Sequence, residues 1–276
     1  MLLLPSIQPR SVGLIARFEL NRLFATPRGW FALGAFAVVW YVILRYGIFE
    51  AAVQMKNPEV QQFLMQGIGM LGMNQILAWG EPEMMVFWLV TLTLLPFGVI
   101  FFASDQTCSD RARGTLRFLT LRTSRESIFI GRFVGQMLVQ TVLISAAMLA
   151  TLGMTAYRLE QLPLNLLLPA LQIIINLLIV LLPFTALMAL ASALVKSNRM
   201  AISLVIFGGG VLLGLLGYLI YLQPSLQSLL SYLPGAQIGQ LYKNAGWVTL
   251  DYADLPLIQT LVILAIGLLV MKEKNV

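Results

Sequence analysis

The sequence predicts an all-α integral membrane protein with six transmembrane helices and little chain that folds in water. Hydrophobic residues make up 59% of the 276 positions and charged residues only 11%, whereas soluble domains carry about 25% charge. The apolar residues form runs long enough to cross about 30 Å of hydrocarbon as helices. Lysine and arginine concentrate in alternate loops between those runs.

The N-terminal segment predicts an amphipathic surface helix, or elbow helix, over residues 10–25. Val12 and Ala16 recur at helical spacing on one side, Arg17 lies opposite, and the segment ends before Pro27. A helix of this kind lies along the cytoplasmic membrane surface. The alternative interpretation is a basic flank that only fixes the topology of the chain.

Six apolar runs follow, each a candidate transmembrane segment. They cover residues 30–46, 84–103, 133–157, 164–195, 201–222 and 255–271. Pro96 predicts a kink in the second segment. The fourth is longer than a simple crossing needs and holds Pro183, so its start is expected to lie tilted at the interface. Glycines 208–210 in the fifth indicate close helix packing or a flexible point.

The loops differ in charge and therefore predict the orientation. Six of the 12 acidic residues fall in the loops over 47–83 and 223–254 and a seventh, Glu160, falls on the same side, whereas 14 of the 18 lysines and arginines fall on the other side. Because cytoplasmic loops retain the basic residues, both termini and the loop over 104–132 are expected in the cytoplasm. The sequence thus predicts one multi-pass domain over 1–276 in the cell inner (cytoplasmic) membrane. The loop over 223–254 fits either a re-entrant hairpin or a plain surface loop.

The inner loop over 104–132 carries the most informative pattern. It contains an acidic residue, arginines, a Gly-Thr-Leu triplet, a Ser-Arg pair and a glycine-rich helix start. These residues are Asp110, Arg111, Arg113, Gly114, Thr115, Leu116, Ser124, Arg125, Gly131, Arg132 and Gly135. Their order and spacing resemble the permease subunits of ABC-2 type transporters. Four positions depart from that family pattern: Asp110 and Ala112 stand where glutamate is frequent, Arg122 stands where proline is frequent, and Arg132 replaces the usual lysine.

The resemblance implies the ABC-2 (type V exporter-like) architecture and the role of a membrane-spanning permease subunit, expected to be an exporter. It also implies a separate ABC ATP-binding subunit in two copies, which binds the ATP and Mg²⁺, and a second permease copy that makes a homodimer or a related pair. The residues implied in coupling to the ATP-binding subunit are Asp110, Arg111, Arg113, Gly114, Thr115, Leu116, Leu119, Ser124 and Arg125.

A coupling helix in this loop also has a physical rationale. A soluble motor needs a short rigid element that projects from the membrane between two spans. Asp110 suits the N-terminal end of such a helix, Gly114 permits a turn, and Leu116, Phe118 and Leu119 offer apolar contacts. The alternative is that the arginines only enforce topology and bind anionic membrane lipid.

Catalysis by this chain is not expected, and neither a cofactor nor a metal site is predicted. It has no Gly-x-x-x-x-Gly-Lys nucleotide-binding sequence, no histidine, and a single cysteine that excludes an internal disulfide. The net charge of +6 does not predict nucleic-acid binding, because the charges lie between apolar runs rather than on one folded face.

Two further function classes stay open on the sequence. A secondary transporter or channel usually carries ionisable residues inside its spans, but the main polar groups there are Gln136, Gln140, Gln172 and Asn176. These four side chains either line a path or hydrogen-bond between helices. The other alternative is an ABC-driven mechanotransmitter, which acts on an extracytoplasmic partner without moving a substrate.

Overall fold

The computed structural model describes residues 7–55, 57–161 and 164–273, and this part of the chain is helical without a strand. Residues 1–6, 56, 162–163 and 274–276 lie outside the described part, so both ends of the predicted domain over 1–276 do too. The first half contains α1 (Pro9–Ala25), α2 (Pro27–Val42), η1 (Ile43–Phe49), α3 (Glu50–Gln54), α4 (Pro58–Met70), η2 (Asn74–Trp79), α5 (Pro82–Phe102), α6 (Cys108–Ala112) and α7 (Thr115–Thr120). The second half contains α8 (Arg125–Leu159), η3 (Leu164–Leu166), α9 (Leu167–Leu194), α10 (Asn198–Leu222), η4 (Pro224–Tyr232), α11 (Ile238–Leu241), η5 (Gly246–Tyr252) and α12 (Asp254–Glu273).

Among the described residues, six helical segments are long and apolar enough to cross a membrane, which confirms the predicted fold class. They are Gly29–Gln54, Pro82–Phe102, Arg125–Leu159, Leu164–Leu194, Asn198–Leu222 and Asp254–Glu273. The first continues past residue 46 because Arg45 lies over the rings of Tyr46 and Phe49 and pairs with Glu50 at 3.6 Å, so the charge does not end the helix. The third begins well before residue 133, at a capped helix start described below.

Helix α9 is the centre of the bundle. It packs against α12, α8, α5 and α10, and its apolar window is the most buried of the six spans. Pro96 in α5 and Pro183 in α9 lie inside helices that continue beyond them, so neither proline ends a span. The core is therefore built from helix faces, with apolar side chains of α5 and α9 in contact.

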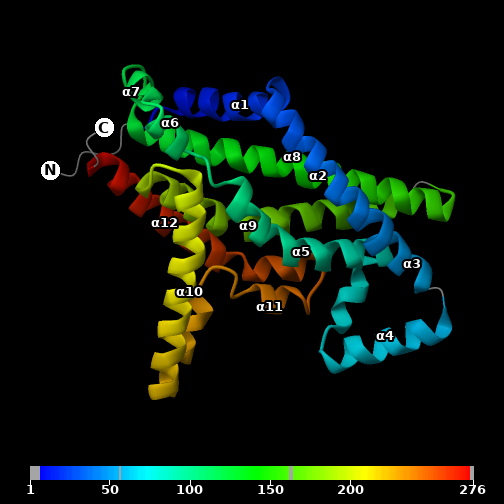
Figure 1. Cartoon of the computed structure of the whole chain (residues 1–276). Coiled ribbons are helices and arrows are strands. Elements are labelled where there is room, and N and C mark those ends of the chain that lie inside the picture. Colours follow the sequence, from blue (N-terminus) through cyan, green and yellow to red (C-terminus); the bar gives the residue numbers. More distant parts are fainter. Residues whose placement is uncertain (1–6, 56, 162–163, 274–276) are drawn as a thin grey trace.

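The two ends of the bundle carry different elements (Figure 1). Helix α1 lies along α8 at one end, together with α6 and α7, and α4 lies at the other end. At the α4 end, Arg158 of α8 forms ion pairs with Glu81 and with the fully buried Glu83 at the start of α5. This network fixes the two helices to each other there.

The loop over 223–254 folds into η4, α11 and η5. The η5 segment contacts α9, and the Trp88 indole of α5 donates a hydrogen bond to the carbonyl of Leu241 at 3.1 Å. Helix α10 behaves differently, because it extends away from the other spans (Figure 1) and only 6% of its window is buried. Its apolar side chains are thus available to lipid or to another protein.

Candidate coupling site

The loop after α5 folds as two short helices, α6 and α7, that meet at Gly114. Gly114 has φ +72°, in the left-handed region that glycine adopts without the strain of a side chain. The Thr115 hydroxyl donates toward the carbonyl oxygen and the carboxylate of Asp110, at 3.1 Å in each case. The turn between the two helices is thereby fixed by its own residues.

Asp110 and Arg132 join this loop to the bundle. The Arg132 guanidinium, on α8, forms ion pairs with Asp110 of α6 and with Glu19 of α1. Burial raises the pKa of the Asp110 carboxyl, while the hydrogen bond from Thr115 and the charge of Arg22 oppose that shift. Breaking a buried pair by removing one partner is costly, because it leaves an uncompensated charge. We call the Glu19, Asp110 and Arg132 cluster the ionic latch.

Gly131 and Gly135, which flank the latch arginine, let α1 approach α8 closely. A Cβ added at Gly131 would lie 2.8 Å from the Ile15 Cβ, and one at Gly135 would lie 2.8 Å from the Glu19 Cβ and 3.1 Å from the Ala16 Cα. Small residues spaced four apart allow this kind of contact between helix backbones. The glycines of the sequence motif therefore have a structural role at the α1–α8 contact.

Several other motif residues also bond within the chain. Arg111 donates to the carbonyl oxygen of Ala193 near the end of α9, at 2.6 Å. Leu116 is fully buried, and Ser124 caps α8 by accepting a hydrogen bond from the Ser127 backbone N–H at 3.2 Å. Arg125, the first residue of α8, is half-buried. The structure thus places Arg111, Leu116 and Ser124 in the framework that holds the loop.

The water-facing part of the loop consists of different residues. Phe118 is 72% exposed and Leu121 is 82% exposed, whereas Leu119 is half-buried. The basic side chains of Arg113, Arg117 and Arg122 are exposed as well. We call Phe118 and Leu121 the apolar tip. Leu121 was not identified in the sequence as a contact residue, although its position three residues after Phe118 places both side chains on one helical face.

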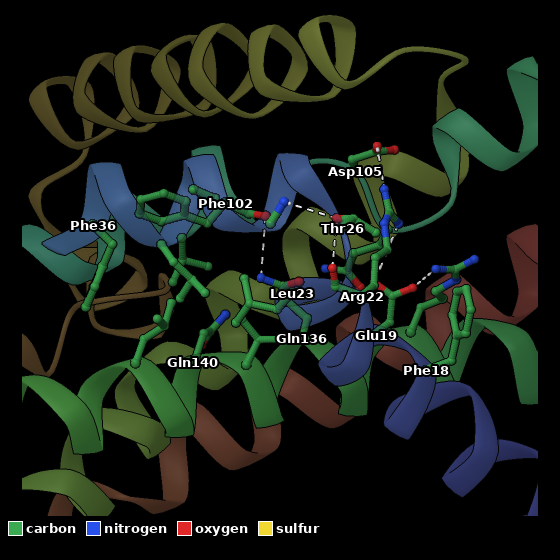
Figure 2. Close-up of a pocket in the computed structure, with 18 of the residues that line it drawn as sticks. Phe18, Glu19, Arg22, Leu23, Thr26, Phe36, Phe102, Asp105, Gln136 and Gln140 are labelled. Atoms are coloured by element: carbon green, nitrogen blue, oxygen red, sulfur yellow. Dashed lines mark hydrogen bonds and ion pairs between the residues drawn. The ribbon is translucent and has the colours of Figure 1, made fainter.

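The four polar residues of the predicted spans divide into two pairs. Gln136 and Gln140 extend from α8 into a cavity of about 570 Å³ that α1, α2 and α5 also line (Figure 2). The amide of Gln140 also donates to the Thr185 hydroxyl of α9 at 2.9 Å, so one side chain both lines the cavity and bonds between helices. Gln172 and Asn176 are buried in α9, and the Asn176 amide donates to the Gln172 carbonyl.

The described residues contain no group of three or more His, Cys, Asp or Glu side chains placed to hold a metal ion. The single cysteine, Cys108, is fully buried at the start of α6. Burial and the nearby Asp105 carboxylate raise the pKa of its thiol to about 12. A thiol that stays protonated is a poor nucleophile and a poor metal ligand.

The comparisons with known proteins give the family of the chain. No curated protein of similar sequence matches the chain. Residues 14–271 match the family model described as "ABC-2 family transporter protein", from α1 to the last turn of α12. This family comprises transmembrane permease subunits of ABC transporters, which work with an ABC ATP-binding partner. The match extends over nearly the whole described chain, and the chain therefore belongs to the ABC-2 family of transporter proteins.

Proposed function

We propose that the chain is the permease subunit of an ATP-driven exporter and that a separate ATP-binding subunit docks on the apolar tip of its first inner loop. The observation that carries this proposal is the exposure of Phe118 and Leu121 beside the exposed side chains of Arg117 and Arg122. Apolar side chains presented to water mark protein contacts, especially where arginines surround them. The loop also bonds to α1 and α8 through the ionic latch, so a displacement of α7 would reach both helices.

The charge distribution supports an orientation with this loop in the cytoplasm. Arg113, Arg117 and Arg122 are exposed at the α7 end, while Glu81 and Glu83 lie at the opposite end. The excess of basic residues on one side orients multi-pass proteins with that side inward. We therefore place α1 on the cytoplasmic surface of the cell inner membrane, with both termini inside.

We further propose an assembly of two permease chains with two ATP-binding subunits, in which the ATP-binding subunits hold all of the ATP and Mg²⁺. The exposed surface of α10 supports contact with a second permease copy, because few of its side chains find partners within the described chain. ATP-driven closure of the two motors would then shift the helices between inward-facing and outward-facing states. Export as the direction follows from the resemblance to exporters of this family.

The docking role is tested with Phe118→Glu in the full-length permease, co-expressed with its ATP-binding subunit. A carboxylate at the apolar tip places a charge in an apolar contact. We therefore expect the amount of ATP-binding subunit recovered with the purified permease to fall at least tenfold. Phe63→Glu in α4 is the matched control, because Phe63 is equally exposed, at 75%, on the opposite end of the protein. We expect this variant to bind the partner as the parent does.

Retention of the ATP-binding subunit by Phe118→Glu at the parental level would contradict docking on the apolar tip. Equal losses in both variants would also contradict it, because they would point to a general effect of an added surface charge. Insertion of each variant is checked by its elution as a single species in detergent.

A further inference from the structure

The cavity beside the latch has one apolar part and one polar part. Its apolar part is lined by side chains of four membrane-crossing segments, among them Trp40 of α2, Val99 of α5, Leu143 of α8 and Leu181 of α9. Its polar part is lined by residues of α1, of the loop after α5 and of α8 (Figure 2). A volume of about 570 Å³ lies within the range of ligand sites, which is about 300–1,000 Å³.

The charged residues of the polar part balance each other. The acidic residues are Glu19, Asp105 and Asp110, and the basic residues are Arg22, Arg113 and Arg132. The ionic latch uses three of these six. The Arg22 guanidinium lies 3.7 Å from the Glu19 carboxylate and 4.0 Å from the Asp105 carboxylate (Figure 2), and Arg113 has no ion pair among the described residues. This part of the cavity thus presents both signs of charge in an open arrangement, which matches a zwitterion better than an anion or a cation.

Two buried side-chain atoms of residues that line the cavity have no hydrogen-bond or ion-pair partner within the described part of the chain. Gln106 is 4% exposed, and its amide nitrogen donates to the carbonyl oxygens of Ala103 and Thr185 at 3.2 and 3.1 Å. Because both of these partners are carbonyl oxygens, the amide group must point its nitrogen toward them. The Gln106 amide oxygen therefore points the other way and accepts no hydrogen bond from the described residues. The Nε of Arg132, a residue that is 5% exposed, is likewise a donor without an acceptor. Leaving such groups unpaired costs about 1–3 kcal/mol each.

We propose that this cavity binds one membrane phospholipid with a phosphoethanolamine headgroup. The primary ammonium would donate to the Gln106 amide oxygen near Asp105, the phosphate would accept from the free arginine N–H groups, and one acyl chain would lie along the apolar part. A quaternary ammonium has no N–H to donate, and a glycerol headgroup has no positive charge for Asp105. The site therefore distinguishes phosphatidylethanolamine from phosphatidylcholine and from phosphatidylglycerol.

The lipid site goes beyond the proposed export function and is tested without nucleotide or an ATP-binding subunit. The purified full chain is delipidated in detergent and titrated with each of the three lipids, with matched acyl chains, and bound lipid is counted by native mass spectrometry. We expect one phosphatidylethanolamine per chain, bound about tenfold more tightly than phosphatidylcholine, since a hydrogen bond to a charged group is worth about that factor. Equal binding of the three lipids would overturn the proposal.

Two variants locate the site. Ala32→Trp fills the cavity from α2 and should weaken phosphatidylethanolamine binding at least tenfold, whereas Ala35→Trp, on an exposed face of the same helix outside the cavity, should leave it unchanged. Gln106→Met removes the amide oxygen that would accept from the ammonium. The ratio of the affinities for phosphatidylethanolamine and phosphatidylcholine should therefore fall close to one. Unchanged binding by Ala32→Trp, or an unchanged preference in Gln106→Met, would overturn the assignment. Displacement of the lipid by equimolar free phosphoethanolamine would also do so, because it would show that the apolar part contributes nothing.

Discussion

Gly135→Ala offers the sharpest test of the α1–α8 contact. The added methyl group would lie 2.8 Å from the Glu19 Cβ and 3.1 Å from the Ala16 Cα. Neither atom is the far end of a flexible side chain, so α1 has to move as a whole. Overpacking of this kind lowers the free energy of unfolding by about 1–3 kcal/mol. The higher helix propensity of alanine raises it by about 1 kcal/mol.

The same substitution at Gly153 is the matched control, because Gly153 lies on the same helix with no atom within 4 Å of an added Cβ. Gly153→Ala should stabilise the protein by about 1 kcal/mol through helix propensity alone. The two variants should therefore differ by about 1–3 kcal/mol, with Gly135→Ala the less stable. At roughly 2–4 °C per kcal/mol, this is a gap of several degrees in the thermal midpoint, measured by tryptophan fluorescence in one detergent. Equal midpoints for the two variants would refute the close contact.

Two further predictions concern the loop. Arg132→Met should lower the free energy of unfolding by about 3 kcal/mol, because it removes the only ion pair of Asp110 among the described residues and leaves Glu19 with Arg22 alone, at 3.7 Å. Arg122→Met on the exposed surface should change the free energy of unfolding by less than about 0.5 kcal/mol. Both are measured by thermal unfolding, and a loss in Arg132→Met no larger than in the control would show that the latch adds no stability. Cys108 should resist maleimide at pH 8 and react fully in denaturant, because burial raises the pKa of its thiol to about 12. Rapid labelling of the native protein would contradict this burial.

The number and type of the helices could be predicted from the sequence because they depend on local properties. A run of apolar residues has few structures available in a bilayer other than a helix, since each backbone polar group needs a partner within the segment. The exact ends were less predictable. The first segment was expected to end at residue 46, yet the helix continues to Gln54, with Arg45 over the rings of Tyr46 and Phe49. Side-chain contacts thus decide the boundary, and hydropathy does not register them.

The roles of the motif residues were harder to predict than their presence. A linear motif does not reveal which side of a short helix faces the bundle, so Leu116 and Phe118 looked equivalent although one is fully buried and the other 72% exposed. The pairing of Arg132 with Glu19 joins segments far apart in the chain, and no local rule predicts it. The spacing of Gly131 and Gly135 did carry a usable signal, because small residues four apart in a membrane helix indicate a closely packed partner.

The ionic latch and the cavity share three residues. Glu19, Asp110 and Arg132 hold the loop to α1 and α8 and also line the polar part of the cavity. If docking of an ATP-binding subunit displaces α6, it changes the positions of charges that the lipid headgroup would contact. Coupling between two binding sites is reciprocal. If bound lipid changes the affinity for the ATP-binding subunit by some factor, docking of that subunit changes the affinity for the lipid by the same factor. The lipid composition of the membrane would then change how tightly the ATP-binding subunit docks, through the contacts of the lipid headgroup with the ionic latch.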